Sequence, residues 1–112
     1  MTERTYLKEF EQLALLSVLR LGEDAYGAKI REDLMETAHR SVSIATIYVA
    51  LSRLERRGFV RSWMSEPTPI RGGKAKKFYA LEAEGRQALW ESKATLERMW
   101  EGVGSALDSA SP

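Results

Sequence analysis

The sequence predicts a mainly α-helical fold with one small β-hairpin, and three observations carry that prediction. Apolar residues recur at helical spacing in segments before residue 58 and again after residue 81. Between them, two runs rich in aromatic and β-branched residues flank a tip that contains prolines and glycines. Eight Lys or Arg residues stand against two acids between residues 53 and 77, a local charge of +6 in a chain of net charge +1. Three helices followed by a basic hairpin outline a winged helix-turn-helix, here with a long C-terminal helix.

Length and composition narrow the function before any motif is considered. A chain of 112 residues is large enough for one domain. It has no cysteine and a single histidine, His39, which excludes disulfides, thiolate metal sites and multi-histidine metal sites. The start of the chain lacks the apolar core of a signal peptide, and no apolar run approaches the roughly 20 residues of a membrane span. We therefore expect a small cytoplasmic protein that is not an enzyme, with no catalytic site, no cofactor, no metal and no membrane contact.

The first two predicted helices form the body of the domain. Residues 5–21 carry a wide apolar face, which indicates a helix buried on more than one side and ended by Gly22. Asp24 is a candidate cap for the second helix. That helix has apolar residues at every fourth position, namely Tyr26, Ile30, Leu34 and Ala38. Gly27 is predicted to lie inside it, where glycine costs stability, so we expect a close approach of another element there.

The third predicted helix, about residues 43–57, has two different faces. Ser43 can cap it, because its hydroxyl can accept from a first-turn backbone N–H. One narrow arc is apolar and is expected to face the core: Ile44, Ile47, Leu51 and Leu54. The opposite face, small near its start and cationic near its end, holds Ala45, Thr46, Val49, Arg53 and Arg56. Small residues allow a close approach to base edges and arginines can reach phosphates, although a merely solvated face remains the alternative.

The hairpin that follows is predicted to be a cationic wing. Residues 59–65 and 76–81 have the character of strands, and the tip between them holds two prolines and a Gly-Gly pair. Arg71 and Lys74 lie on this tip, with Lys76 and Lys77 at its base. Such a finger, about residues 66–77, suits the minor groove or flanking phosphates of double-stranded DNA. The alternative is a surface loop without a binding role.

The last predicted helix, residues 82–107, is expected to form a dimer. Five apolar residues fall within one wedge along it: Leu89, Leu96, Trp100, Val103 and Leu107. Spacings of seven along this wedge are typical of coiled coils, so a homodimer follows, with residues 1–81 as the DNA-binding domain and 108–112 as a flexible tail. Trp90, Met99 and Trp100 are candidates for stacking a small aromatic effector at the dimer seam. Alternatively they are ordinary interface core, or Trp90 covers the first helix.

Three stretches of the chain match a known pattern, and together they run from about Gly22 to Leu89. They are Ala25-Tyr26-Gly27, then Val42-Ser43-x-x-Thr46-Ile47-Tyr48-x-Ala50-Leu51-x-Arg53-Leu54-Glu55-x-Arg57-Gly58, and Lys77-Phe78-Tyr79-x-Leu81-x-x-x-Gly85-x-x-Ala88-Leu89. In these stretches the chain resembles the PadR family of bacterial winged-helix transcription regulators. It departs from the family at Ala45, where glycine is usual, at Val49, where proline is usual, and at Glu82, where threonine is common. The first two departures affect the exposed face of the third helix.

The resemblance implies a homodimeric repressor that binds a pseudo-palindromic operator and is sometimes released by a small or phenolic compound. It also implies roles for single positions. Tyr48 would contact a DNA phosphate, or be a half-buried packing residue, and Ser43 and Thr46 would lie near the DNA backbone. Arg53 would lie deeper along the helix, and the wing contacts would be Lys74, Lys76 and Lys77. A competing interpretation is a winged-helix module that binds another protein through the apolar C-terminal helix, without specific DNA binding.

Overall fold

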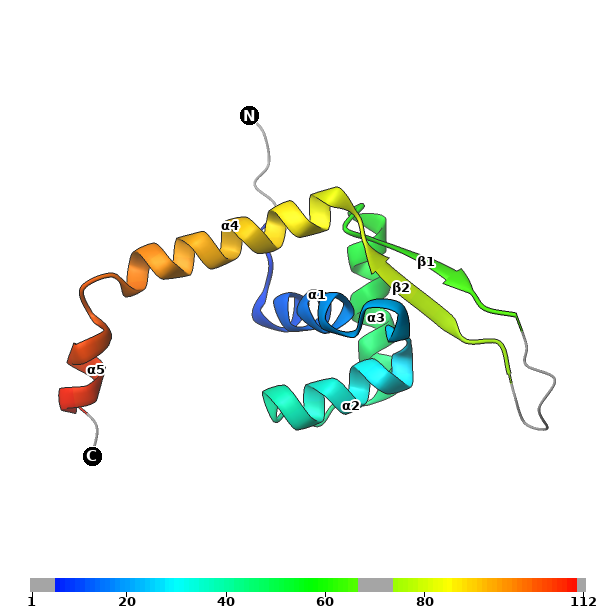
Figure 1. Cartoon of the computed structure of the whole chain (residues 1–112), viewed down its shortest axis with the longest axis horizontal. Helices are drawn as coiled ribbons and strands as arrows, with labels where there is room; N and C mark the ends of the chain where they lie inside the picture. The colour runs from blue at the N-terminus through cyan, green and yellow to red at the C-terminus, as the bar shows by residue number, and fades with distance from the viewer. Residues whose placement is uncertain (1–5, 67–73, 111–112) are drawn as a thin grey trace.

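The computed structural model describes residues 6–66 and 74–110. Its elements in order are α1 (Glu9–Leu21), the short 3-10 helix η1 (Gly22–Asp24), α2 (Gly27–Ala38), α3 (Ile44–Arg56), β1 (Val60–Met64), β2 (Lys77–Leu81), α4 (Ala83–Trp100) and α5 (Gly104–Ala110). Figure 1 shows α1, α2 and α3 gathered into one body, with the hairpin extending to one side and α4 running away to the other. The predicted fold class, mainly helical with a small β-hairpin, is therefore confirmed.

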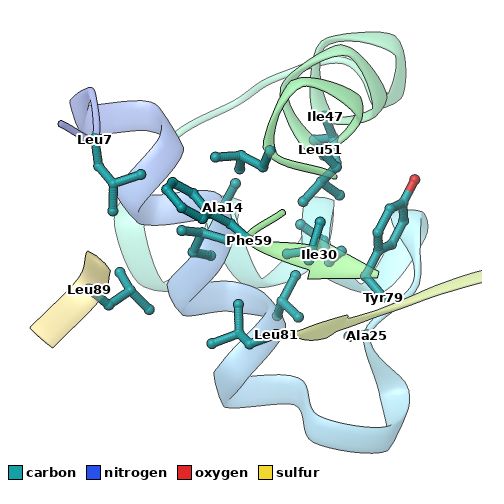
Figure 2. Close-up of a cluster of buried hydrophobic side chains, with 14 of the residues drawn as sticks. Leu7, Ala14, Ala25, Ile30, Ile47, Leu51, Phe59, Tyr79, Leu81 and Leu89 are labelled. Carbon is teal, nitrogen blue, oxygen red and sulfur yellow. The ribbon is translucent and has the colours of Figure 1, made fainter. Parts of the chain in front are cut away.

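The hydrophobic core lies where the three helices of the body meet the hairpin and the start of α4. Figure 2 shows side chains from all of these elements converging on one cluster. Its members include Leu7, Ala14, Leu15, Ile30, Leu34, Ile47, Leu51, Leu54, Phe59, Tyr79, Leu81 and Leu89. Because Leu89 is only 9% exposed in this cluster, it packs against its own chain. Leu89 therefore has little surface left for the dimer interface in which the sequence pattern placed it.

Local signals set most helix ends. Gly22, at φ +58°, ends α1 as predicted, and Gly58, at φ +81°, follows α3. The Thr46 backbone N–H donates to Ser43 Oγ at 3.1 Å, which confirms the predicted cap of α3. Asp24 does not cap α2, because it is wound into η1 and Tyr26 is the cap residue instead, with no side-chain cap bond. Likewise Gly27 is the first residue of α2 and not an interior one.

The hairpin is an antiparallel pair joined firmly to the body. Trp63 of β1 pairs with Phe78 of β2, and their rings stack at 6.1 Å between centroids. The Tyr79 backbone N–H donates to the Ala25 carbonyl at 2.9 Å, and Tyr26 forms an isolated β-bridge with Phe78. These bonds extend the two-stranded sheet onto the segment before α2, so the base of the wing is fixed relative to the helices.

The C-terminal helix is interrupted, which corrects the prediction of one helix through residue 107. Helix α4 ends at Trp100, and α5 begins at Gly104 after a turn in which Gly102 has φ +77°. Glycine costs about 1 kcal/mol relative to alanine within a helix, so two glycines this close together favour a break. Figure 1 shows α5 turned away from the line of α4. No helix within the described residues is long and apolar enough to cross a bilayer.

A partly buried carboxylate joins α1 to α2. Ser17 Oγ donates to Asp33 Oδ2 at 2.8 Å, Thr37 Oγ1 donates to Oδ1 at 3.1 Å, and Arg20 Nε lies 3.2 Å from Oδ2. Burial alone would raise the pKa of Asp33, but the hydrogen bonds from Ser17, Arg20 and Thr37 outweigh it and lower the pKa below 3.8. The ionised carboxylate therefore stabilises the pairing of these helices.

We expect Asp33→Ala to lower the free energy of unfolding at pH 7 by about 2 kcal/mol, because the buried Ser17 hydroxyl loses its acceptor. Since the folded-state pKa is depressed, the contribution of Asp33 is present above pH 3.8 and is lost as the pH falls through that value towards the folded pKa. Urea titrations of both proteins at pH 7 and pH 3 test this. A difference that stays constant between the two pH values would contradict it.

Candidate nucleic-acid interface

The exposed face of α3 follows the sequence prediction closely. Val49 is 53% exposed, and the neighbouring predicted residues Ala45, Thr46, Arg53 and Arg56 are exposed as well. On the opposite side Ile47, Leu51 and Leu54 are fully buried. Ile44 is the exception, because at the first position of the helix it lies beyond the edge of the core and is 37% exposed. The helix is therefore fixed by one face and free to meet a partner with the other.

The hydroxyl groups at the start of α3 have different surroundings. The Ser43 hydroxyl accepts from the Thr46 backbone N–H in the cap and lies 2.9 Å from the Thr46 hydroxyl, so each hydroxyl already has a partner. Tyr48 is 38% exposed, and its phenol lies against Gly27 at the start of α2. The sequence left two roles open for Tyr48, a phosphate contact and a half-buried packing residue. Its position is compatible with both, since it packs against the body and still reaches the surface.

The described part of the wing places lysines over aromatic rings. Lys76 Nζ lies 4.4 Å from the centre of the Tyr26 ring, and Lys77 Nζ lies 5.9 Å from the centre of the Tyr79 ring. Lys74 and Lys76 are exposed, whereas Lys77 is partly buried. Arg71, predicted to bind DNA from the tip, falls outside the described residues. The rings hold the two lysines at the base of the tip without neutralising their charge.

Two arginines of the cationic stretch serve the fold instead. Arg57 forms an ion pair with Glu11 at 3.2 Å and donates to the Tyr6 carbonyl at 2.7 Å. Arg61 forms an ion pair with Glu82 at 2.8 Å. The other cations that the structure describes between residues 53 and 77 have no carboxylate at ion-pairing distance: Arg53, Arg56, Lys74, Lys76 and Lys77. The positive charge that is not neutralised by an ion pair in this stretch is therefore located on α3 and the wing.

A side-chain contact that was not predicted from the sequence joins α3 directly to the wing. Ser62 Oγ on β1 lies 2.8 Å and 3.0 Å from the two carboxylate oxygens of Glu55 on α3, to which it can donate. Burial, together with the negative charge of Glu55, raises the pKa of the nearby Tyr79 to about 12, so this phenol stays neutral. Only the alternation along β1, which turns Ser62 towards α3, could have suggested the contact. It fixes the wing relative to the helix beside it.

Exposed apolar residues gather on the end of α4, on α5 and in the turn between them. The predicted dimer residues Leu96, Trp100, Val103 and Leu107 are 51%, 50%, 46% and 57% exposed, and Met99 is 72% exposed. We call these five residues the C-terminal apolar face. Met99, Trp100, Val103, Ala106 and Leu107 line a hollow of about 360 Å³.

A second hollow, of about 510 Å³, lies between α1 and α4 and includes Leu16, Leu19, Trp90 and Leu96 in its lining. The predicted effector residues are therefore divided, because Met99 and Trp100 share the first hollow whereas Trp90 lies in the second. Trp90 itself is 65% exposed. Along the second hollow, α1 lies next to the exposed part of α4. The sequence indicated a wide apolar face on α1.

A three-helix body whose third helix presents a free face beside a basic hairpin defines a winged helix-turn-helix DNA-binding protein. The model of the family described as "Transcriptional regulator PadR-like family" matches residues 15–91. The chain belongs to this family, whose members regulate transcription, and the resemblance stated from the sequence is confirmed. The match ends before the C-terminal apolar face begins.

Solved structures agree with this assignment. A PadR family transcription regulator from Clostridium difficile is 26% identical with a TM-score of 0.67, the match covering 85% of this chain and 97% of that one. A PadR-like transcription factor from Bacteroides fragilis is 28% identical with a TM-score of 0.68, covering 87% and 88%. A PadR family regulator from Eggerthella lenta is 26% identical with a TM-score of 0.61, covering 86% and 84%. No curated protein matches the chain.

Proposed function

We propose that the protein is a cytoplasmic, homodimeric repressor that binds a pseudo-palindromic operator in double-stranded DNA. The observation that supports this best is the distribution of unpaired charge. Arg53 and Arg56 on α3 and the three lysines of the wing lack carboxylate partners in the described part of the chain, whereas Arg57 and Arg61 are paired. Cations held in place without a counter-charge suit a polyanion. The exposed α3 residues 45, 46 and 49 would lie in the major groove.

A second copy of the chain completes this proposal. Two-fold symmetry would place two α3 helices in successive major grooves, roughly 34–36 Å apart along the duplex. The C-terminal apolar face and the hollow between α1 and α4 supply uncovered apolar surface for the association. The interface would then use Leu96, Trp100, Val103 and Leu107 but not Leu89, which the core already holds.

Release by a small aromatic ligand is a second candidate property. Met99 and Trp100 line a hollow whose volume, about 360 Å³, lies within the range of small-molecule sites. An indole and a thioether provide flat, polarisable surface for a planar ring. Because Trp90 lies in the other hollow, we limit this proposal to Met99 and Trp100.

Selection of bound sequences from random double-stranded DNA at two salt concentrations tests the main proposal. We expect an enriched inverted repeat whose affinity falls as salt rises, by about 0.9 log units per log unit of salt for each phosphate contacted. Arg53→Ala should weaken binding and reduce that slope, because Arg53 is exposed and unpaired. Lys8→Ala, which removes an exposed charge at the start of α1, is the matched control and should change neither.

Two other outcomes would contradict the proposal in different ways. Salt-sensitive binding without an enriched sequence would indicate a non-specific DNA-binding protein. No binding even at low salt would instead favour a protein-interaction module that uses the C-terminal apolar face.

A further inference from the structure

The first residue of α2 is a glycine whose missing side chain is replaced by a phenol from α3. A methyl group placed on Gly27 would lie 2.6 Å from the Tyr48 hydroxyl oxygen, 2.9 Å from Cζ and 3.1 Å from Cε1. Gly27 is buried, while Tyr48 keeps 38% of its surface exposed. The end of the phenol therefore occupies the place that any larger residue at position 27 would need.

The place where the phenol rests suits an anion. The first N–H groups of a helix have no partner within the helix, and they form its positive end. No side chain caps α2 at Tyr26, and Ala28 in the first turn is exposed. The Lys76 ammonium lies 4.4 Å from the Tyr26 ring, so a cation of the wing stands beside the same helix end. The Tyr48 hydroxyl adds a directed donor at this point.

We propose that Gly27 is a positioning residue for DNA binding, because it leaves the space in which the Tyr48 phenol is held against the first turn of α2. In that position the Tyr48 hydroxyl donates to a backbone phosphate that also lies at the start of α2. This inference rests on the proposed DNA-binding function and adds to it a residue whose missing side chain positions another residue. Gly27 acts only through Tyr48, which separates it from a glycine that merely permits close packing.

A double-mutant cycle in operator affinity tests the inference. Gly27→Ala should weaken binding about tenfold, because the methyl displaces the phenol and one charge-assisted hydrogen bond is lost. Tyr48→Phe, which removes only the hydroxyl, should weaken binding to a similar degree. In the Tyr48→Ala background there is room for the methyl, so adding Gly27→Ala should cause no further loss.

Thermal unfolding of the same variants provides the structural control. The atoms that a methyl would meet belong to the end of a flexible side chain, so Gly27→Ala should leave the melting temperature unchanged or raise it. Gly104→Ala, where a methyl would meet nothing within 4 Å, should likewise not lower the melting temperature.

Three results would overturn the inference while leaving DNA binding intact: additive losses in the cycle, a Tyr48→Phe variant with full affinity, or a loss of affinity that tracks a loss of stability. A wild-type protein that does not bind DNA at any salt concentration would overturn the proposed function as well.

Discussion

Gly85→Ala is expected to destabilise the folded protein more strongly than a methyl group added at Gly27 or Gly104. A methyl group at Gly85 would overlap the carbonyl oxygen of Phe59 and come within 3.1 Å of its carbonyl carbon. That carbonyl already accepts from the Glu82 backbone N–H at 2.9 Å, so it is held in place at the start of α4. Because the obstacle is backbone and cannot rotate away, α4 must shift from the core. We expect a loss of about 3 kcal/mol in the free energy of unfolding.

Urea unfolding of the wild type, Gly85→Ala and Gly104→Ala measures this directly. Gly104 is the matched control, because it also lies in a helix and a methyl there would meet no atom within 4 Å. We expect Gly104→Ala to unfold at the same urea concentration as the wild type or a higher one. Equal midpoints for the two variants would show that α4 is not packed against Phe59 in the way the structure describes.

The fold was predictable wherever the signal is local. The cap at Ser43, the apolar arc of α3 and the glycine at position 58 lie within one short stretch, so α3 could be placed nearly to the residue. The prediction failed in the last helix because apolar spacing carries no information about a break in the backbone. Val103 and Leu107 continue the apolar period of Leu96, but Gly102 and Gly104 interrupt the helix that would carry them.

The sequence could predict which residue types the candidate interface contains, but not which of those residues are already paired within the fold. Arg53 and Arg57 look equivalent in the sequence, yet Arg57 is held by Glu11, 46 residues earlier, and its guanidinium lies 4.8 Å from the centre of the Phe59 ring. Pairing across such separations depends on how helices meet, which no local pattern records. Leu89 shows the same limit, since its heptad position suggested an interface and the core holds it.

The second large effect is expected at the C-terminal apolar face. We expect the double variant Leu96→Glu with Trp100→Glu to be monomeric and to bind operator DNA at least about 100-fold more weakly, because one half-site contributes much less affinity than two. Both side chains are about half exposed and neither belongs to the core cluster, so the fold should be unaffected. Two carboxylates buried in an apolar interface without partners would be strongly unfavourable.

Analytical ultracentrifugation and operator binding, carried out on the same samples, separate the possible outcomes. Met35→Glu is the control, because Met35 is an exposed apolar residue on α2, 45% exposed and away from both hollows of the proposed interface. A monomer with weakened DNA binding would support assembly through the C-terminal apolar face, which lies beyond the residues of the family match. A variant that remains dimeric would move the interface elsewhere, and α1 with its exposed Leu16 and Leu19 would be the surface to change next. A monomer with full affinity would show that α3 and the wing of one chain suffice, and the proposal of a two-fold operator would then be wrong.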